Sequence, residues 1–164
     1  MIKNTEWYRE TLAKLDADIQ KAESSLERLK RHRIKTIRML APMAARDCAA
    51  EGRKFLGQWA VGSGLNSEAR WEILLMPDSF EIKEIWGVTV WATGTILWRR
   101  KEWKEGLWKP MCGETTPDGK KVAARQVFEG TSPLYEFRKA TRKEIETALS
   151  IIAATGNKED QHAP

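Results

Sequence analysis

The sequence predicts an α+β protein, in which a long N-terminal helix precedes an antiparallel, tryptophan-rich sheet of about four to six strands and a C-terminal helix. Three observations carry this prediction. Residues 4–40 contain no glycine or proline and repeat apolar side chains at helical spacing. Residues 71–128 are rich in β-branched and aromatic side chains, with glycines and prolines between them. Residues 141–156 return to a helical pattern.

The first helix carries a heptad repeat. Its apolar residues step by four and three along one edge, which is the spacing of a coiled-coil seam. Such a narrow stripe suits burial against another helix, because a sheet would contact a wider apolar face. Leu12, Ile19 and Leu26 take position a, and position d is taken by Tyr8, Leu15, Ala22 and Leu29. We therefore expect a surface that binds a helix.

Pro42 suggests that the long helix ends and a second one begins. Proline fits the first turn of a helix better than its interior, and it pushes the preceding residue out of helical geometry. A second helix is expected over 43–59, so that residues 1–62 form a helical, coiled-coil-like hairpin. This second helix is too short to cover the whole seam. Tyr8, Leu12 and Leu15 would then lack a partner inside the chain.

Charge is sorted along the first helix. Residues 1–27 hold six acids and four bases, whereas residues 28–38 hold six bases and no acid. A parallel homodimer would place Asp18 opposite Glu23 of its mate, and a fully overlapping antiparallel one would place Asp16 opposite Glu23. A basic partner helix or a staggered dimer fits these charges better, and homo-oligomerisation through this helix stays open. The alternative is that the seam packs entirely on the chain's own helix and sheet.

The rest of the chain predicts a meander followed by a helix. Glycines at 62 and 64 mark a break, Pro77-Asp78 a turn, and Thr141 with Glu144 a capping box, T-x-x-E, at the start of the last helix. Gly156 is expected to end that helix. Strands are expected near 71–76, 82–91, 95–100, 107–111 and 122–128. The regions are thus a helical hairpin over 1–62, a sheet with a helix over 65–156, and a disordered tail over 157–164.

Signals for catalysis are absent from the sequence. The two histidines are poorly placed for a nucleophilic triad, and two distant cysteines make neither a disulfide framework nor a four-ligand zinc site. We expect no enzyme activity, no metal and no cofactor. A pocket with converging, perturbed carboxylates would reopen the question of an enzyme. The chain lacks a signal-peptide pattern and a long apolar stretch, which favours a cytoplasmic protein without a membrane span.

The strongest remaining candidate for a binding site is the basic, tryptophan-rich segment WRRKEWKEGLWK, residues 98–109. Tryptophan and arginine dominate binding hot spots, and indoles among bases also stack on unpaired nucleobases. The plainer alternative is that the tryptophans belong to the sheet core. With Tyr8, Leu12 and Leu15 of the seam, the candidate protein-binding residues are Trp98, Arg99, Arg100, Trp103 and Trp108. The candidate nucleic-acid-binding residues are Arg31, Arg33, Arg99, Arg100, Lys101 and Lys104.

These patterns predict a non-catalytic interaction protein. It would act as an adaptor or a stoichiometric inhibitor, docking on another macromolecule through the seam and the tryptophan-rich segment. A short, charged chain of this kind also resembles an accessory protein of a phage or mobile element. The alternative is a module that binds nucleic acid directly, which the net charge of +5 permits.

Overall fold

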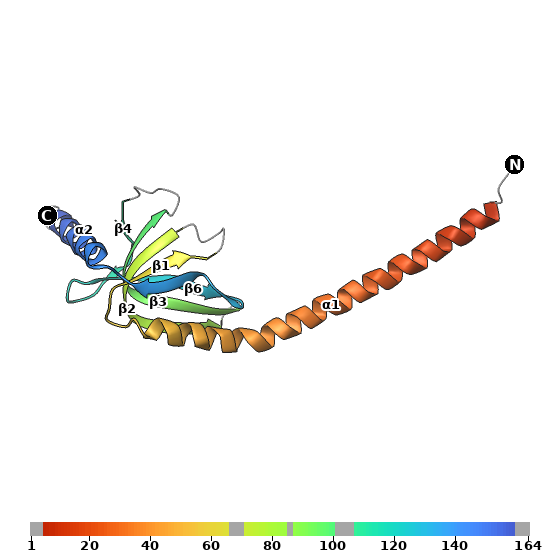
Figure 1. Ribbon diagram of the computed structural model, residues 1–164, viewed down its shortest axis with the longest axis horizontal. Coiled ribbons are helices and arrows are strands. Elements are labelled where there is room, and N and C mark those ends of the chain that lie inside the picture. Colours follow the sequence, from red (N-terminus) through yellow and green to blue (C-terminus); the bar gives the residue numbers. More distant parts are fainter. Residues whose placement is uncertain (1–4, 66–70, 85–86, 101–106, 160–164) are drawn as a thin grey trace. The chain divides into compact units, whose positions relative to one another are not determined.

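A computed structural model describes residues 5–65, 71–84, 87–100 and 107–159. The chain divides into two compact units, unit 1 up to Leu40 and unit 2 from Ala41 onwards. Figure 1 shows the element order. The helices are α1 (Thr5–Arg53) and α2 (Arg142–Glu159). The strands are β1 (Ala60–Gly64), β2 (Trp71–Glu84), β3 (Val88–Arg100), β4 (Lys109–Pro110), β5 (Glu114–Thr115), β6 (Lys121–Glu129), β7 (Ser132–Pro133) and β8 (Tyr135–Lys139).

The α+β class is confirmed, but the predicted helical hairpin is wrong. α1 continues through Pro42 to Arg53, and the chain then turns directly into β1, so the described residues contain no separate helix over 43–59. Proline inside a helix costs about 3 kcal/mol, because it removes one backbone hydrogen bond and crowds the preceding turn. Burial of Ala45 and Ala49 against the sheet offsets part of that cost here.

Among the described residues the antiparallel sheet has eight strands, more than the four to six expected. Six of them follow the order β5-β6-β3-β2-β1-β8, while β4 pairs with β3 and β7 pairs with β6. Residues 132–139 link strands that lie far apart in this order, because β7 pairs with β6 whereas β8 pairs with β1. Leu134 bridges the two pairings: its N–H donates to the carbonyl of Val127, and its own carbonyl accepts from the N–H of Leu65. The strands therefore curl around a common interior (Figure 1).

Several predicted strand boundaries are wrong. Pro77 and Asp78 lie inside β2, where the register shifts at a bulge, and do not form a turn between strands. The strand expected over 82–91 is instead the end of β2 and the start of β3, with Gly87 between them. Gly62 and Gly64, where a break was expected, lie within β1. The expected strand near 107–111 is shortened to β4, and the one near 122–128 is confirmed as β6.

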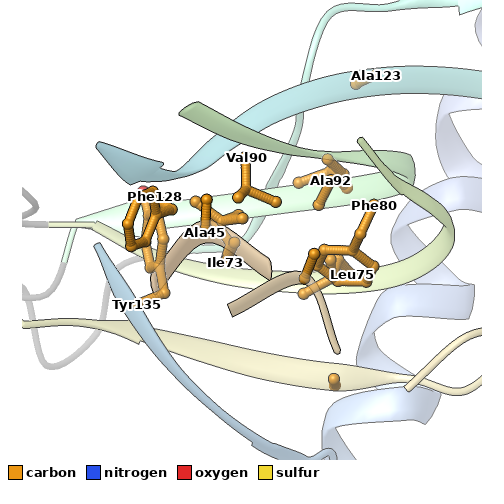
Figure 2. Packing of buried hydrophobic residues seen from close by; sticks show 13 residues of the cluster. Ala45, Ile73, Leu75, Phe80, Val90, Ala92, Ala123, Phe128 and Tyr135 are labelled. Atoms are coloured by element: carbon orange, nitrogen blue, oxygen red, sulfur yellow. The ribbon is translucent and has the colours of Figure 1, made fainter. Parts of the chain in front are cut away.

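Two apolar clusters cover opposite faces of the strands. Along β2, Ile73 belongs to the cluster that packs on the last turns of α1, and its neighbour Leu74 belongs to the cluster beneath α2. This alternation follows from the two-residue period of a strand. Figure 2 shows the first cluster, in which Phe80 and Phe128 are among the buried rings. The second cluster contains Val61, Leu74, Leu97, Trp108 and Ala148.

The predicted capping box at the start of α2 is confirmed. The Thr141 N–H donates to the Glu144 carboxylate at 2.7 Å, and the Glu144 N–H donates to Oγ1 of Thr141 at 3.3 Å. The expected end at Gly156 is wrong, because α2 continues through it to Glu159. Residues 157–159 of the expected tail therefore lie in α2, and residues 160–164 lie outside the described residues.

Candidate interaction surfaces

The heptad seam of α1, from Tyr8 to Leu29, is exposed along its length. Leu12 has 59% of its surface exposed, and Leu29 has 62%. Unit 1 consists of helix alone among the described residues, so it contains no second element on which the seam could pack. Exposed contiguous apolar surface is one of the features by which interaction sites are sought. Tyr8, Leu15, Ile19 and Leu26 are exposed to a similar degree, between 52% and 55%.

Local contacts support the helix of unit 1 only weakly. Lys30 pairs with Glu27 at 2.9 Å, and both side chains are more than half exposed. Near the start, the rings of Trp7 and Tyr8 meet edge to face with their centroids 5.0 Å apart. Surface pairs three residues apart contribute only a few tenths of a kcal/mol. Most helical stability comes from packing an apolar face, so this helix gains most from a partner.

The structure divides the tryptophan-rich segment between two faces of the sheet. Trp98 pairs with Ile73 across β2 and β3, and therefore lies on the face of the first cluster together with Arg100. Arg99 points to the opposite face, where Trp108 belongs to the second cluster. The residues expected to form one surface are thus split by the alternation of β3.

On the α2 side, Trp108 belongs to the second cluster, and Arg99, whose side chain is 29% exposed, lies over it. The Arg99 side chain bonds the Glu72 carboxylate at 2.6 and 2.7 Å, and its guanidinium lies over the Trp108 ring, 4.3 Å from the centroid. Trp108 is only 7% exposed. This indole is therefore covered on the sheet and is not presented for stacking on a ligand.

On the other face, two indoles border a cavity of about 240 Å³, here named the tryptophan pocket, which is lined by Trp71, Trp98, Met111 and Arg125. The two indole rings meet edge to face, 4.8 Å between centroids. The Arg125 guanidinium donates to the hydroxyl of Tyr135 at 2.8 and 3.0 Å. The pocket therefore combines aromatic surface with a fixed positive charge.

Two further cations lie over the rings of the tryptophan pocket. The Arg100 guanidinium is 5.2 Å from the centroid of Trp71, and Nζ of Lys109 is 5.8 Å from the centroid of Trp98. These distances are in the range of cation–π attraction. Such a site suits a planar or anionic group, because the rings offer faces and the cations offer charge.

The sequence predicted Trp98 of this pocket and Arg100 beside it, but it did not indicate Trp71 or Arg125. Trp71 and Arg100 are far apart in the sequence, and the register of β2 and β3 places them opposite each other. Arg125 comes from β6, and the residues around it in the sequence do not indicate that it lines a pocket. Trp103, Lys101 and Lys104 lie outside the described residues. Arg31 and Arg33 are exposed on α1, in unit 1.

A larger cavity of about 390 Å³ lies between α2 and the strands. Its described lining is mostly apolar, including Trp59, Met76 and Leu149, with Lys120 and Lys121 as the charged members. Lys120 also pairs with Asp78 at 2.7 Å. No carboxylate or imidazole belongs to that described lining, so it offers apolar contact without an acid–base pair.

Within the ranges that the structure describes, no group of three or more His, Cys, Asp or Glu residues is arranged to hold a metal ion. Neither described helix combines the length and apolarity needed to cross a membrane. Comparison of the chain with protein-family models, with curated proteins and with solved structures finds no match.

Proposed function

We propose that the protein is a non-catalytic interaction protein, an adaptor or a stoichiometric inhibitor acting in the cytoplasm, whose heptad seam docks on a helix. The observation that carries this proposal is the exposure of the seam from Tyr8 to Leu29. A helix of this kind buries its apolar stripe when a second helix packs alongside it.

The size of the apolar stripe supports specific binding. Each half-exposed leucine or isoleucine gains on the order of 1 kcal/mol when it is buried, and the partner's side chains gain a similar amount. Five such residues on each helix therefore supply on the order of 10 kcal/mol. Association costs about 4–15 kcal/mol in lost freedom, so the seam suits a matched apolar stripe rather than a flat polar surface.

Site-specific photo-crosslinking in living cells tests the proposal. A photoreactive residue at Leu15, on the seam, is compared with one at Ala17, on the opposite side of the same turn. We expect covalent adducts to a protein from position 15 and few from position 17. Equal yields at the two positions, or no adduct from either, would contradict the proposed docking surface.

A matched pair of substitutions supplies the control. Ala22→Asp introduces a carboxylate at a d position, and Ala17→Asp introduces the same group on the outer side of the helix. Both change the helix propensity equally, by about 0.5 kcal/mol. We expect Ala22→Asp to abolish the adduct from Leu15, because an unpaired charge cannot be buried cheaply, and Ala17→Asp to preserve it.

Direct binding of single-stranded nucleic acid is a second candidate function, supported by the edge-to-face indoles and cations of the tryptophan pocket. Its test is tryptophan fluorescence of the full chain titrated with an oligonucleotide at two salt concentrations. We expect affinity to fall steeply with salt, and Trp98→Ala to weaken binding. Trp91, which lies under Lys83 elsewhere on the sheet, is the matched control. Equal loss from Trp91→Ala would contradict this second function.

A further inference from the structure

The sorted charges of α1 indicate which helix covers the seam. Within α1, residues 5–27 carry six acids and three bases, and residues 28–38 carry six bases. An acidic stretch followed by a basic one is complementary to the same sequence running in the opposite direction. We propose that the partner is a second copy of this chain, paired antiparallel through the seam. This inference rests on the proposed function and names its partner.

A parallel pair is disfavoured by the same charges. It would bring the six bases of residues 28–38 alongside the same six bases of the second copy. It would also place Asp18 opposite Glu23 on both sides of the interface. An antiparallel pair instead brings the basic stretch of each copy alongside the acidic stretch of the other, which is attractive at the rim of a coiled coil.

The flanking charges also distinguish between two registers that keep most of the seam overlapped. In full overlap, Leu12 packs with Leu29 of the second copy, and Asp16 then faces Glu23. A shift of one heptad packs Ile19 with Leu29 and places Asp16 opposite Lys30 on both sides. The shifted register thus replaces the repulsive pairs of Asp16 with Glu23 by attractive pairs of Asp16 with Lys30. Glu23 then faces Glu23 of the second copy near the two-fold axis.

The shifted register also accommodates the charged residue that follows Leu26 in the series of a positions. Arg33 occupies the next a position, and the shift places it opposite Leu15 of the second copy. The aliphatic stem of an arginine can cover a leucine while its guanidinium stays in solvent. Asp16 and Asp18 follow that leucine within three residues and Lys14 precedes it, so two carboxylates and one ammonium lie near the guanidinium.

Sedimentation equilibrium of the full chain tests self-association. We expect a monomer–dimer equilibrium that Ala22→Asp weakens at least about 100-fold, because both copies bury the new carboxylate, while Ala17→Asp changes it less than about threefold. A chain that stays monomeric at the highest concentration overturns the proposal of a second copy. Seam-specific adducts to a different protein would in that case still support the proposed function.

Charge reversal distinguishes the registers by the sign of its effect. In the shifted register Asp16→Lys faces Lys30 and weakens the dimer about three- to tenfold, and adding Lys30→Glu restores it. In full overlap the same Asp16→Lys faces Glu23 and strengthens the dimer. A stronger dimer, or no rescue by the second substitution, overturns the proposed register.

Disulfide trapping gives an independent test of orientation. Single cysteines are introduced at Leu12, Ile19 or Leu29 of full chains in which Cys48 and Cys112 are replaced, and pairs of chains are mixed and oxidised. We expect the disulfide between positions 19 and 29 to predominate. Predominance of a 19–19 disulfide indicates a parallel dimer, and predominance of 12–29 indicates full overlap. Either of these outcomes overturns the proposal.

Discussion

Replacing Glu144 by glutamine should destabilise the fold at neutral pH and lose that effect in acid. The Glu144 carboxylate accepts bonds from the Arg138 guanidinium at 2.7 and 3.0 Å, and from the Thr141 N–H and hydroxyl at 2.7 and 2.9 Å. These contacts, the bond from Arg138 first, lower the pKa of Glu144 from 4.5 to about 2. They stabilise the charged form, and therefore the folded state.

The size of the effect follows from the pKa difference. A lowering from 4.5 to about 2 corresponds to about 3 kcal/mol. The Arg138 side chain is 52% exposed, so solvent screens the pair, and about 1–2 kcal/mol is expected for Glu144→Gln at pH 7. Because the folded pKa is lowered, this stabilisation is present above pH 4.5 and is lost as the pH falls through 2.

Urea denaturation at pH 7, 4 and 2 measures this prediction. The gap in free energy of unfolding between the native chain and Glu144→Gln should narrow below pH 4.5 and close near pH 2. Glu146→Gln is the control: its partner Arg142 is 93% exposed, so a change under about 0.5 kcal/mol is expected. A gap that is absent at pH 7, or constant down to pH 2, would refute the reasoning.

Three further predictions concern the core. Gly52→Ala should destabilise the fold by about 1–3 kcal/mol in urea, because its Cβ would overlap the Phe80 ring; Phe80→Leu in the same chain should relieve part of that loss. Cys48 should react with maleimide at pH 8 at least about tenfold more slowly than exposed Cys112, since burial raises the pKa of Cys48 to about 11; equal rates by peptide mass spectrometry would contradict this. Trp108→Ala should lower the free energy of unfolding by about 3–5 kcal/mol, whereas replacing an indole that is exposed to solvent would change it little.

The sequence predicted those elements whose signal is local. The capping box of Thr141 and Glu144 depends only on residues three apart, and the length of α1 before Pro42 depends on helix propensity and period. Gly62 gave a misleading signal. It was interpreted as a break, yet it lies in β1, because a Cβ there would lie 2.7 Å from Phe137 and 2.9 Å from Ile73. Only the packed sheet shows that this glycine permits close approach.

The candidate site was predicted only in part, for a similar reason. The order of residues along the sequence grouped Trp98 with Trp108, whereas the alternation of β3 sends Trp98 and Arg99 to opposite faces. The pocket is completed by Trp71 and Arg125, which β2 and β6 bring beside Trp98. These contacts depend on strand register, and register follows from the whole sheet.

The central claim is that the seam of α1 lies against another helix in the working protein. Thiol labelling inside intact cells tests it most directly, with a cysteine at Ile19 on the seam compared with one at Ala17 on the outer side of the helix. Both positions are exposed in the single chain, so each should react alike if nothing binds. We expect labelling at least about tenfold slower at position 19 than at position 17, with the difference abolished by denaturation. Equal labelling at the two positions in native protein would contradict it.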